Sequence, residues 1–165
     1  MTSESQSASS FTGALPIPYT AEEVGRTFAD LLDTLDFAAE LQDLGISSLR
    51  VFKRRQAKKH FRAVCIALWH IALEKSFPND AEAFFAHFMT TSPLVSAEQK
   101  NARKLRAMVE TYDALLVEKK DADFTTIAEE ITRQFEQGHE EQRRHQLKLS
   151  LRIRAIYDLI FDKLI

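Results

Sequence analysis

The sequence predicts an all-α protein, a single irregular bundle of five or six helices. Apolar residues recur at the three- and four-residue spacing of a helix through most of the chain, and helix-start signals precede several of these stretches. Only 4 glycines and 4 prolines among 165 residues leave little material for the turns of a β-sandwich or barrel. With 45% hydrophobic residues the chain can fill a core, and a lone cysteine excludes a disulfide scaffold.

The chain divides into a flexible N-terminal arm, residues 1–18, and a helical bundle domain, residues 19–165. The arm is rich in serine, threonine and glutamine, and such a segment buries too little apolar surface to offset the entropy of ordering. It has no Lys or Arg and no apolar core, so we expect no secretory signal. The unpaired Cys65 suits a reducing compartment, and we expect a cytoplasmic protein.

The first helix is expected over residues 21–44. Thr20 and Glu23 have the spacing of a capping box, in which each side chain satisfies a backbone N–H that the helix leaves unpaired. Gly45 supplies a residue that easily adopts the left-handed conformation at a helix end. Apolar residues recur at helical spacing between these two signals: Val24, Phe28, Leu31, Leu35 and Ala38.

The second helix is predicted to start at a cap formed by Ser47 or Ser48 and to end near Ser76, before Pro78. Its segment 63–73 is the longest apolar stretch, but it is shorter than the roughly 20 residues of a membrane span. We therefore expect a buried core helix and no membrane partner.

A short third helix is predicted to begin with Asn79 as its cap and to end at Ser92-Pro93. A fourth follows the box formed by Ser96 and Gln99. Its apolar seam is too short for a coiled coil and favours packing within the bundle: Ala102, Leu105, Val109, Tyr112 and Leu116.

A fifth helix is predicted to start at Asp123 and to carry Phe124, Ile127, Ile131 and Phe135. Gly138 either ends this helix or weakens one longer helix at that point.

The last segment has two readings. Apolar and polar residues alternate over 147–154, which is a strand pattern, but a single strand would find no partner in a helical chain. One helical stripe accounts for the same residues, and we predict a helix: Leu149, Ile153, Ile156, Ile160 and Leu164. Leu147 and Leu151 fall outside this stripe, so they widen the apolar face and favour contact with a second copy or another protein.

Two segments free of acidic residues, 50–62 and 143–154, contain 12 of the 22 Lys and Arg residues. Residues Arg50, Arg54, Lys58 and Arg62 are spaced four apart, as in a stripe that neutralises the phosphates of a nucleic acid. The candidate residues for binding nucleic acid or another anionic partner are Arg50, Arg54, Arg55, Lys58, Lys59, Arg62, Arg143 and Arg144.

A solvated or internally complemented basic face is the favoured alternative. The helix expected over 21–44 carries seven acidic residues and a single Arg, and it can complement the basic segments within the bundle or between subunits. A pI of about 6.2 is low for a dedicated nucleic-acid binder. The chain also lacks the spacing of a helix-turn-helix, a zinc finger or an RNP motif.

The sequence predicts no catalytic residue, metal site or cofactor. Glu136 and His139 form the single Glu-x-x-His match, which Gly138 interrupts, so a di-iron site is not expected. His70 lies in the most apolar stretch and is interpreted as a hydrogen-bonded core histidine. Cys65 is interpreted as a small buried hydrophobic residue.

An aromatic group formed by Trp69, Phe84, Phe85 and Phe88 has two interpretations. It either fills one end of the core, which is favoured, or lines a pocket for an apolar ligand. The leading functional hypothesis is a non-enzymatic interaction or regulatory protein that self-associates or docks a partner through its C-terminal helix. Nucleic-acid binding and apolar-ligand binding are the alternatives.

Overall fold

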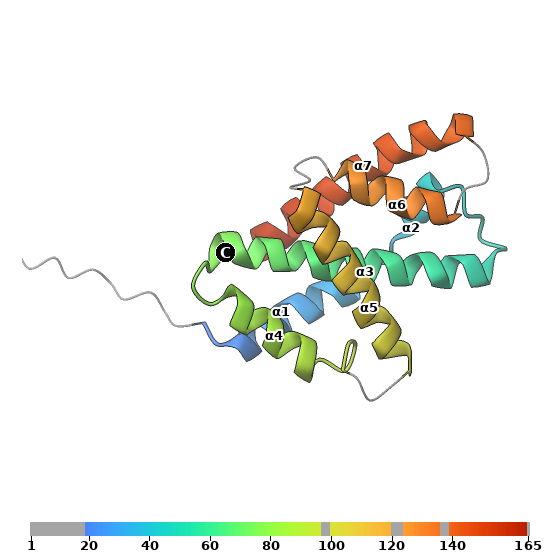
Figure 1. The fold of residues 1–165 in the computed structure, drawn as a ribbon. Helices are drawn as coiled ribbons and strands as arrows, with labels where there is room; N and C mark the ends of the chain where they lie inside the picture. Colours follow the sequence, from blue (N-terminus) through green and yellow to red (C-terminus); the bar gives the residue numbers. More distant parts are fainter. Residues whose placement is uncertain (1–18, 97–99, 120–123, 136–138, 165) are drawn as a thin grey trace, which may run out of the picture.

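The computed structural model describes residues 19–96, 100–119, 124–135 and 139–164, and within these ranges it contains seven helices and no strand (Figure 1). The predicted all-α class is confirmed, while the predicted flexible arm lies outside the described residues. The helices are α1 (Ala21–Thr34), α2 (Ala38–Asp43), α3 (Val51–Ser76), α4 (Ala81–Thr91), α5 (Lys100–Lys119), α6 (Thr125–Phe135) and α7 (His139–Leu164).

Helix α3 runs through the middle of the bundle and packs against α4, α5, α6 and α7 (Figure 1). Every residue from Ala63 to His70 is buried, so this part of the helix is covered on all sides. A helix that is apolar around its whole circumference belongs in the interior. The predicted core helix is confirmed. No helix in the described part of the chain is both long enough and apolar enough to span a bilayer.

Helix α1 begins at the predicted capping box. The Glu23 N–H donates to Thr20 Oγ1 at 3.2 Å, and the Thr20 N–H donates to Glu23 Oε2 at 3.0 Å. These two hydrogen bonds satisfy donors that the first turn would otherwise leave unpaired.

The predicted continuous helix over 21–44 is wrong, because the chain breaks after Thr34 and restarts as α2. Phe37 adopts the left-handed conformation, with φ of 58°, and the Asp36 carboxylate accepts a hydrogen bond from the Ala38 N–H at 2.9 Å. The break directs the Phe37 ring inward, where it stacks on Phe61 with 5.5 Å between ring centroids. Burial of this ring offsets the backbone strain, and the split raises the helix count above the number predicted.

Gly45 ends α2 as predicted. It has φ of +65°, and its N–H donates to the Gln42 carbonyl at 2.9 Å. The next N–H, that of Ile46, donates to the Leu41 carbonyl at 3.0 Å. This pair of bonds is the Schellman motif, which uses two of the carbonyls left free at a helix end.

The predicted cap of α3 is wrong. Arg50 is the N-cap and makes no side-chain capping bond, while Ser47 contributes its backbone carbonyl to the Arg50 N–H at 3.1 Å. Here a backbone turn takes the place of a serine hydroxyl.

The predicted cap of α4 is one residue early. Asp80 is the N-cap rather than Asn79, without a side-chain cap, and the Phe77 carbonyl accepts from the Asp80 and Ala81 N–H groups at 2.9 and 2.8 Å. The corner between α3 and α4 is therefore held by backbone bonds. Gln99, Asp123 and Gly138, which also belonged to predicted boundaries, lie outside the described residues.

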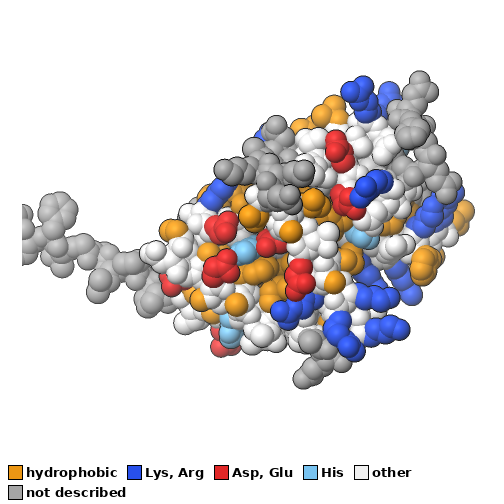
Figure 2. All heavy atoms as spheres, in the orientation of Figure 1, with side chains coloured by type: hydrophobic (Ala, Val, Ile, Leu, Met, Phe, Trp, Pro, Cys, Tyr) orange, Lys and Arg blue, Asp and Glu red, His pale blue; other side chains and the backbone are white. Residues whose placement is uncertain are grey.

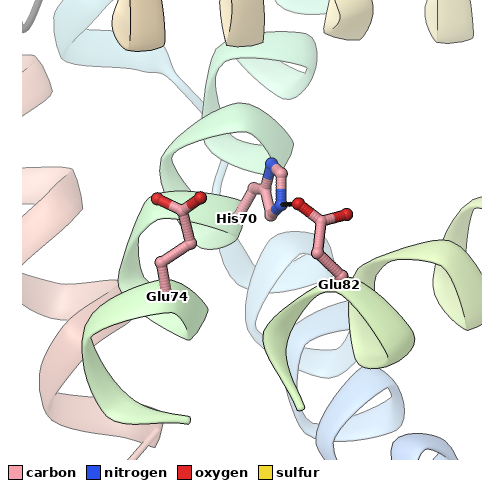
Figure 3. A group of neighbouring side chains, drawn as sticks. All are labelled: His70, Glu74 and Glu82. Carbon is pink, nitrogen blue, oxygen red and sulfur yellow. Dashed lines mark ion pairs between the residues drawn. The ribbon is translucent and has the colours of Figure 1, made fainter. Parts of the chain in front are cut away.

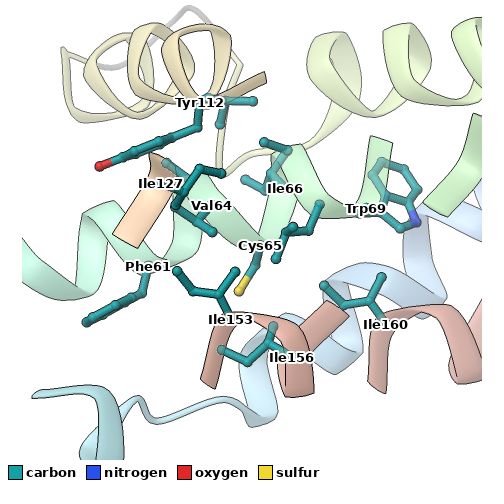
Figure 4. Close-up of a cluster of buried hydrophobic side chains, with 14 of the residues drawn as sticks. Phe61, Val64, Cys65, Ile66, Trp69, Tyr112, Ile127, Ile153, Ile156 and Ile160 are labelled. Carbon is teal, nitrogen blue, oxygen red and sulfur yellow. The ribbon is translucent and has the colours of Figure 1, made fainter. Parts of the chain in front are cut away.

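Residues 147–154 are helical, so the predicted helix is confirmed over the strand alternative. The stripe Leu149, Ile153, Ile156 and Ile160 is buried, and Figure 4 shows Ile153 beside Cys65 of α3, with Ile160 farther along towards Trp69. Leu147 and Leu151 remain 65% and 59% exposed, because the helical repeat places them beside the stripe rather than on it.

The two faces of α7 give a paired prediction. Ile153→Ala should lower the free energy of unfolding by about 2–5 kcal/mol, because its fully buried side chain leaves a cavity. Leu151→Ala, on the exposed face, should change it by less than about 0.5 kcal/mol. Urea denaturation of both variants measures the difference. A strand would place residues 151 and 153 on the same face, so equal losses would contradict the helix.

Candidate functional site

A cavity of about 650 Å³ lies between the first half of α3, the first half of α5 and the connection between α1 and α2. We call it the basic groove. Its lining residues come from three separate parts of the sequence: Leu35, Phe37, Phe52, Arg55, Gln56, Lys58, Lys59, His60, Arg62, Lys104 and Met108.

Five cationic side chains surround the groove, and its lining includes no carboxylate. Arg55, Lys58, Lys59 and Arg62 follow one another at intervals of three, one and three residues, which places them on one face of α3. Lys104 faces them from α5. Figure 2 shows Lys and Arg side chains gathered towards the end of the molecule where α3 and α5 begin.

The groove cations make no ion pair within 4.0 Å with any residue in the described ranges, whereas Asp and Glu elsewhere pair with other arginines. Within the described ranges, no carboxylate at ion-pair distance offsets the mutual repulsion of these charges. An arrangement of this kind attracts an anion to its centre.

Four of the eight predicted anion-binding residues line the groove, namely Arg55, Lys58, Lys59 and Arg62. Arg50 precedes α3, and Arg54 turns away to donate to the Ile46 carbonyl at 3.4 Å. The reason is helical geometry: a spacing of four residues advances by about 40° per step, so a stripe from 50 to 62 winds around the helix.

The second predicted segment lies elsewhere. Arg143 and Arg144 are exposed on α7 and do not line the groove. Arg152 of the same segment donates to Asp43 Oδ2 at 3.1 Å. The acidic segment 21–44 thus complements the basic part of α7 at this one pair, and among the described residues it makes no ion pair with 50–62.

Sequence reasoning missed the other groove residues, namely Leu35, Phe37, Phe52, Gln56, His60, Lys104 and Met108. Among these, Lys104 and Met108 belong to a different helix, α5. They are spaced four apart and so share a face of their helix. The four-residue spacing predicts that the two side chains share a face of α5. It does not predict which other helix lies opposite that face.

The groove also contains apolar side chains and a buried histidine. Phe37 and Met108 contribute apolar surface, and Phe52 is 80% exposed at the edge. His60 Nδ1 lies 2.7 Å from the Tyr112 hydroxyl oxygen. Burial lowers the pKa of His60, against the opposing effect of the Glu130 charge, so the positive charge of the groove comes from Lys and Arg.

Cys65 is fully buried, as predicted. Burial raises the pKa of its thiol, and the nearby Glu40 charge raises it further. A thiol held in its protonated form is a poor nucleophile, so Cys65 serves the core.

The predicted aromatic group is packed into the core. Trp69 stacks on Phe28 at 4.5 Å between centroids and meets Phe88 edge to face at 4.9 Å. Phe84 contacts Phe77 and Phe85 lies against His70. Phe88 also lines a pocket of about 230 Å³ between α1 and α4. The apolar-ligand site stays a prediction.

His70 is the hydrogen-bonded core histidine that the sequence predicted. It is buried, and its Nδ1 lies 2.9 Å from Asp113 Oδ1 on α5. The Glu136-x-x-His139 match, from which no metal site was expected, lies outside the residues whose side chains the structure describes.

Comparison with protein-family models, curated proteins and solved structures finds no match to this chain. The fold and the groove by themselves define the class: an all-α bundle whose central helix presents a cation-lined groove with an apolar wall.

Proposed function

We propose that this is a non-enzymatic interaction protein whose basic groove binds an acidic, partly apolar segment of a partner protein. The observation that supports it is the presence of five cations without ion-pair partners among the described residues, arranged around apolar side chains in one cavity.

The charge distribution favours an anionic partner. The whole chain carries a net charge of -2, so the remainder is clearly acidic once the groove is set aside. A local positive field on an otherwise acidic protein guides the acidic patch of a partner towards the groove. The acidic remainder of the protein repels the same patch. The groove is therefore the part of the surface where the carboxylates of a partner gain the most favourable electrostatic energy.

The size and wall of the groove favour a short segment with apolar anchors. A volume of about 650 Å³ lies within the usual range for binding pockets, roughly 300–1,000 Å³. Phe52 and the partly buried Met108 offer apolar contact, while Lys58 and Arg62 offer charge beside it. A peptide helix or turn with carboxylates flanking an apolar residue matches both properties.

A protein segment accounts for these features better than a nucleic acid does. A nucleic-acid backbone needs a continuous basic track to neutralise successive phosphates. Here the cations surround a compact cavity, and Arg143 and Arg144 are not part of it. The acidic remainder of the surface also opposes a long polyanion.

The charge requirement is testable with a triple variant, Lys58→Gln with Lys59→Gln and Arg62→Gln. The probe is a fluorescent peptide in which glutamates alternate with leucines, and fluorescence anisotropy measures its affinity. We expect a loss of roughly tenfold or more and a reduced salt dependence, because three charges around one site are removed.

The matched control is Arg143→Gln with Arg144→Gln and Lys148→Gln, which removes the same charge from exposed positions on α7. It should retain the affinity of the natural protein. Equal losses in both triple variants would contradict a site in the groove. Tighter binding of a single-stranded oligonucleotide of equal charge would favour the nucleic-acid alternative instead.

The apolar requirement is testable at Phe52. Its side chain is mostly exposed, so Phe52→Ala should leave the melting temperature unchanged while lowering peptide affinity by about tenfold, as expected for an aromatic anchor. Leu49→Ala is the control, because Leu49 is also exposed but does not line the groove. An unchanged affinity for Phe52→Ala would remove the apolar half of the proposal.

Self-association through α7 is a second candidate function, and the exposure of Leu147 and Leu151 supports it. The two leucines are four residues apart on one face, and covering them would withdraw apolar surface from water. A second copy or a partner helix would provide this cover.

Light scattering over a range of protein concentrations tests this second function. We expect a mass above that of one chain, reduced to a single chain by Leu147→Glu with Leu151→Glu. The matched control, Leu49→Glu with Val51→Glu, changes two exposed apolar residues away from α7 and should keep the larger mass. A natural protein that stays monomeric throughout argues against self-association.

A further inference from the structure

A second group of chemically reactive side chains, His70, Glu74 and Glu82, lies where α3 meets α4, apart from the basic groove (Figure 3). His70 and Glu74 are one turn apart on the same face of α3. Glu82 belongs to the first turn of α4, which the backbone-held corner after Phe77 brings back against α3. One donor atom from each side chain lies within 4.8 Å of the other two.

The imidazole of His70 is held in place from two other helices. Its Nδ1 lies 2.9 Å from Asp113 Oδ1 on α5, and its ring stacks on Phe85 of α4 with 3.9 Å between centroids and 8° between planes. In the neutral ring, an Nδ1–H that donates to the Asp113 carboxylate leaves the lone pair on Nε2. In metal-binding histidines the second ring N–H commonly donates to a carboxylate, a backbone carbonyl or water, and Asp113 has the first of these roles here.

The Nε2 atom is buried and has no hydrogen-bond partner within the described structure. His70 is only 6% exposed, and Nε2 lies 3.4 Å from Glu82 Oε1. A lone pair facing a carboxylate oxygen at this distance is repulsive unless a positive charge lies between the two atoms. A cation between the two atoms, either a proton on Nε2 or a metal ion, would make this arrangement favourable.

The separation of His70 Nε2 and Glu82 Oε1 fits a shared metal ion. Zinc bonds of about 2.0–2.1 Å in a tetrahedral site place neighbouring donor atoms about 3.4 Å apart. His70 Nε2 and Glu82 Oε1 already have this separation. Glu74 is exposed, so rotation of its side chain can bring its carboxylate in from its present position. A proton on Nε2 would account for the contacts of His70 with Glu82 and Asp113, whereas a metal ion would also bind the carboxylate of Glu74, which lies within 4.8 Å of the other donor atoms.

We propose that His70, Glu74 and Glu82 bind a divalent transition-metal ion of the zinc class, with Asp113 as the positioning residue behind the imidazole. One imidazole nitrogen and two carboxylate oxygens form a ligand set that zinc accepts, whereas magnesium prefers oxygen ligands and keeps its waters. Three protein ligands leave a fourth position for water or for a group on a partner. The ion would join α3 to α4 beside the buried aromatic group.

The test uses the full chain after treatment with a chelator. Zinc chloride is titrated while thermal unfolding is recorded, and cobalt is titrated in parallel while its visible absorption is recorded. Zinc at 100 times its Kd should raise the folding equilibrium constant about 100-fold, because it binds the folded state alone. Magnesium at the same concentration should leave the melting temperature unchanged.

Glu74→Gln with Glu82→Gln should abolish the zinc-induced shift and the cobalt absorption band. Both glutamates are exposed, so this variant is expected to fold. Asp30→Asn with Asp33→Asn, two exposed carboxylates on α1, makes the same charge change and should respond like the natural protein. Asp113→Asn keeps all three ligands and should weaken zinc binding by roughly 10–100-fold.

Two results would overturn the proposal. The first is a natural protein whose melting temperature does not respond to zinc, which would leave a proton as the charge between His70 and Glu82. The second is a zinc response of equal size in the natural protein and in Glu74→Gln with Glu82→Gln, which would place the bound ion at other residues.

Discussion

Burial of one stretch of α3 on every side is the constraint on which the rest of this structure depends. Every side chain from Ala63 to His70 is buried, and α4, α5, α6 and α7 pack against this helix. The same helix extends back towards Arg50 beyond part of this cover, and its cations lie there at the surface. One continuous helix therefore contributes both the centre of the core and most of the cations of the basic groove.

Both candidate sites lie along α3, and α5 contributes to each. Lys104 and Met108 of α5 complete the groove, and Asp113, which follows Met108 on the same helix, hydrogen-bonds the imidazole of His70. Tyr112, next to Asp113, contacts His60 from the same helix. Helices are rigid over such lengths, and the side chains between α3 and α5 are closely packed. The position of α5 along α3 therefore determines the geometry of both sites.

Local signals in the sequence account for many of the elements and some of their ends. The capping box at Thr20 and the left-handed turn at Gly45 were predictable because each depends on a few neighbouring residues. The break at Phe37 was not, because the apolar pattern continues through it and the ring gains its partner, Phe61, from a distant part of the chain. Likewise, the sequence identified the basic residues of α3. The predicted stripe of residues spaced four apart was wrong as a single face, because such residues turn gradually around the helix.

The sequence by itself determined the all-α class, the buried central helix and the separation of basic from acidic segments, because periodicity and composition act over short distances. The tertiary structure alone decided that Lys104 faces Lys58 across a groove and that Glu82 meets His70. Those neighbours come from helices whose relative placement depends on side-chain packing across the whole core. No spacing within a single segment carries that information.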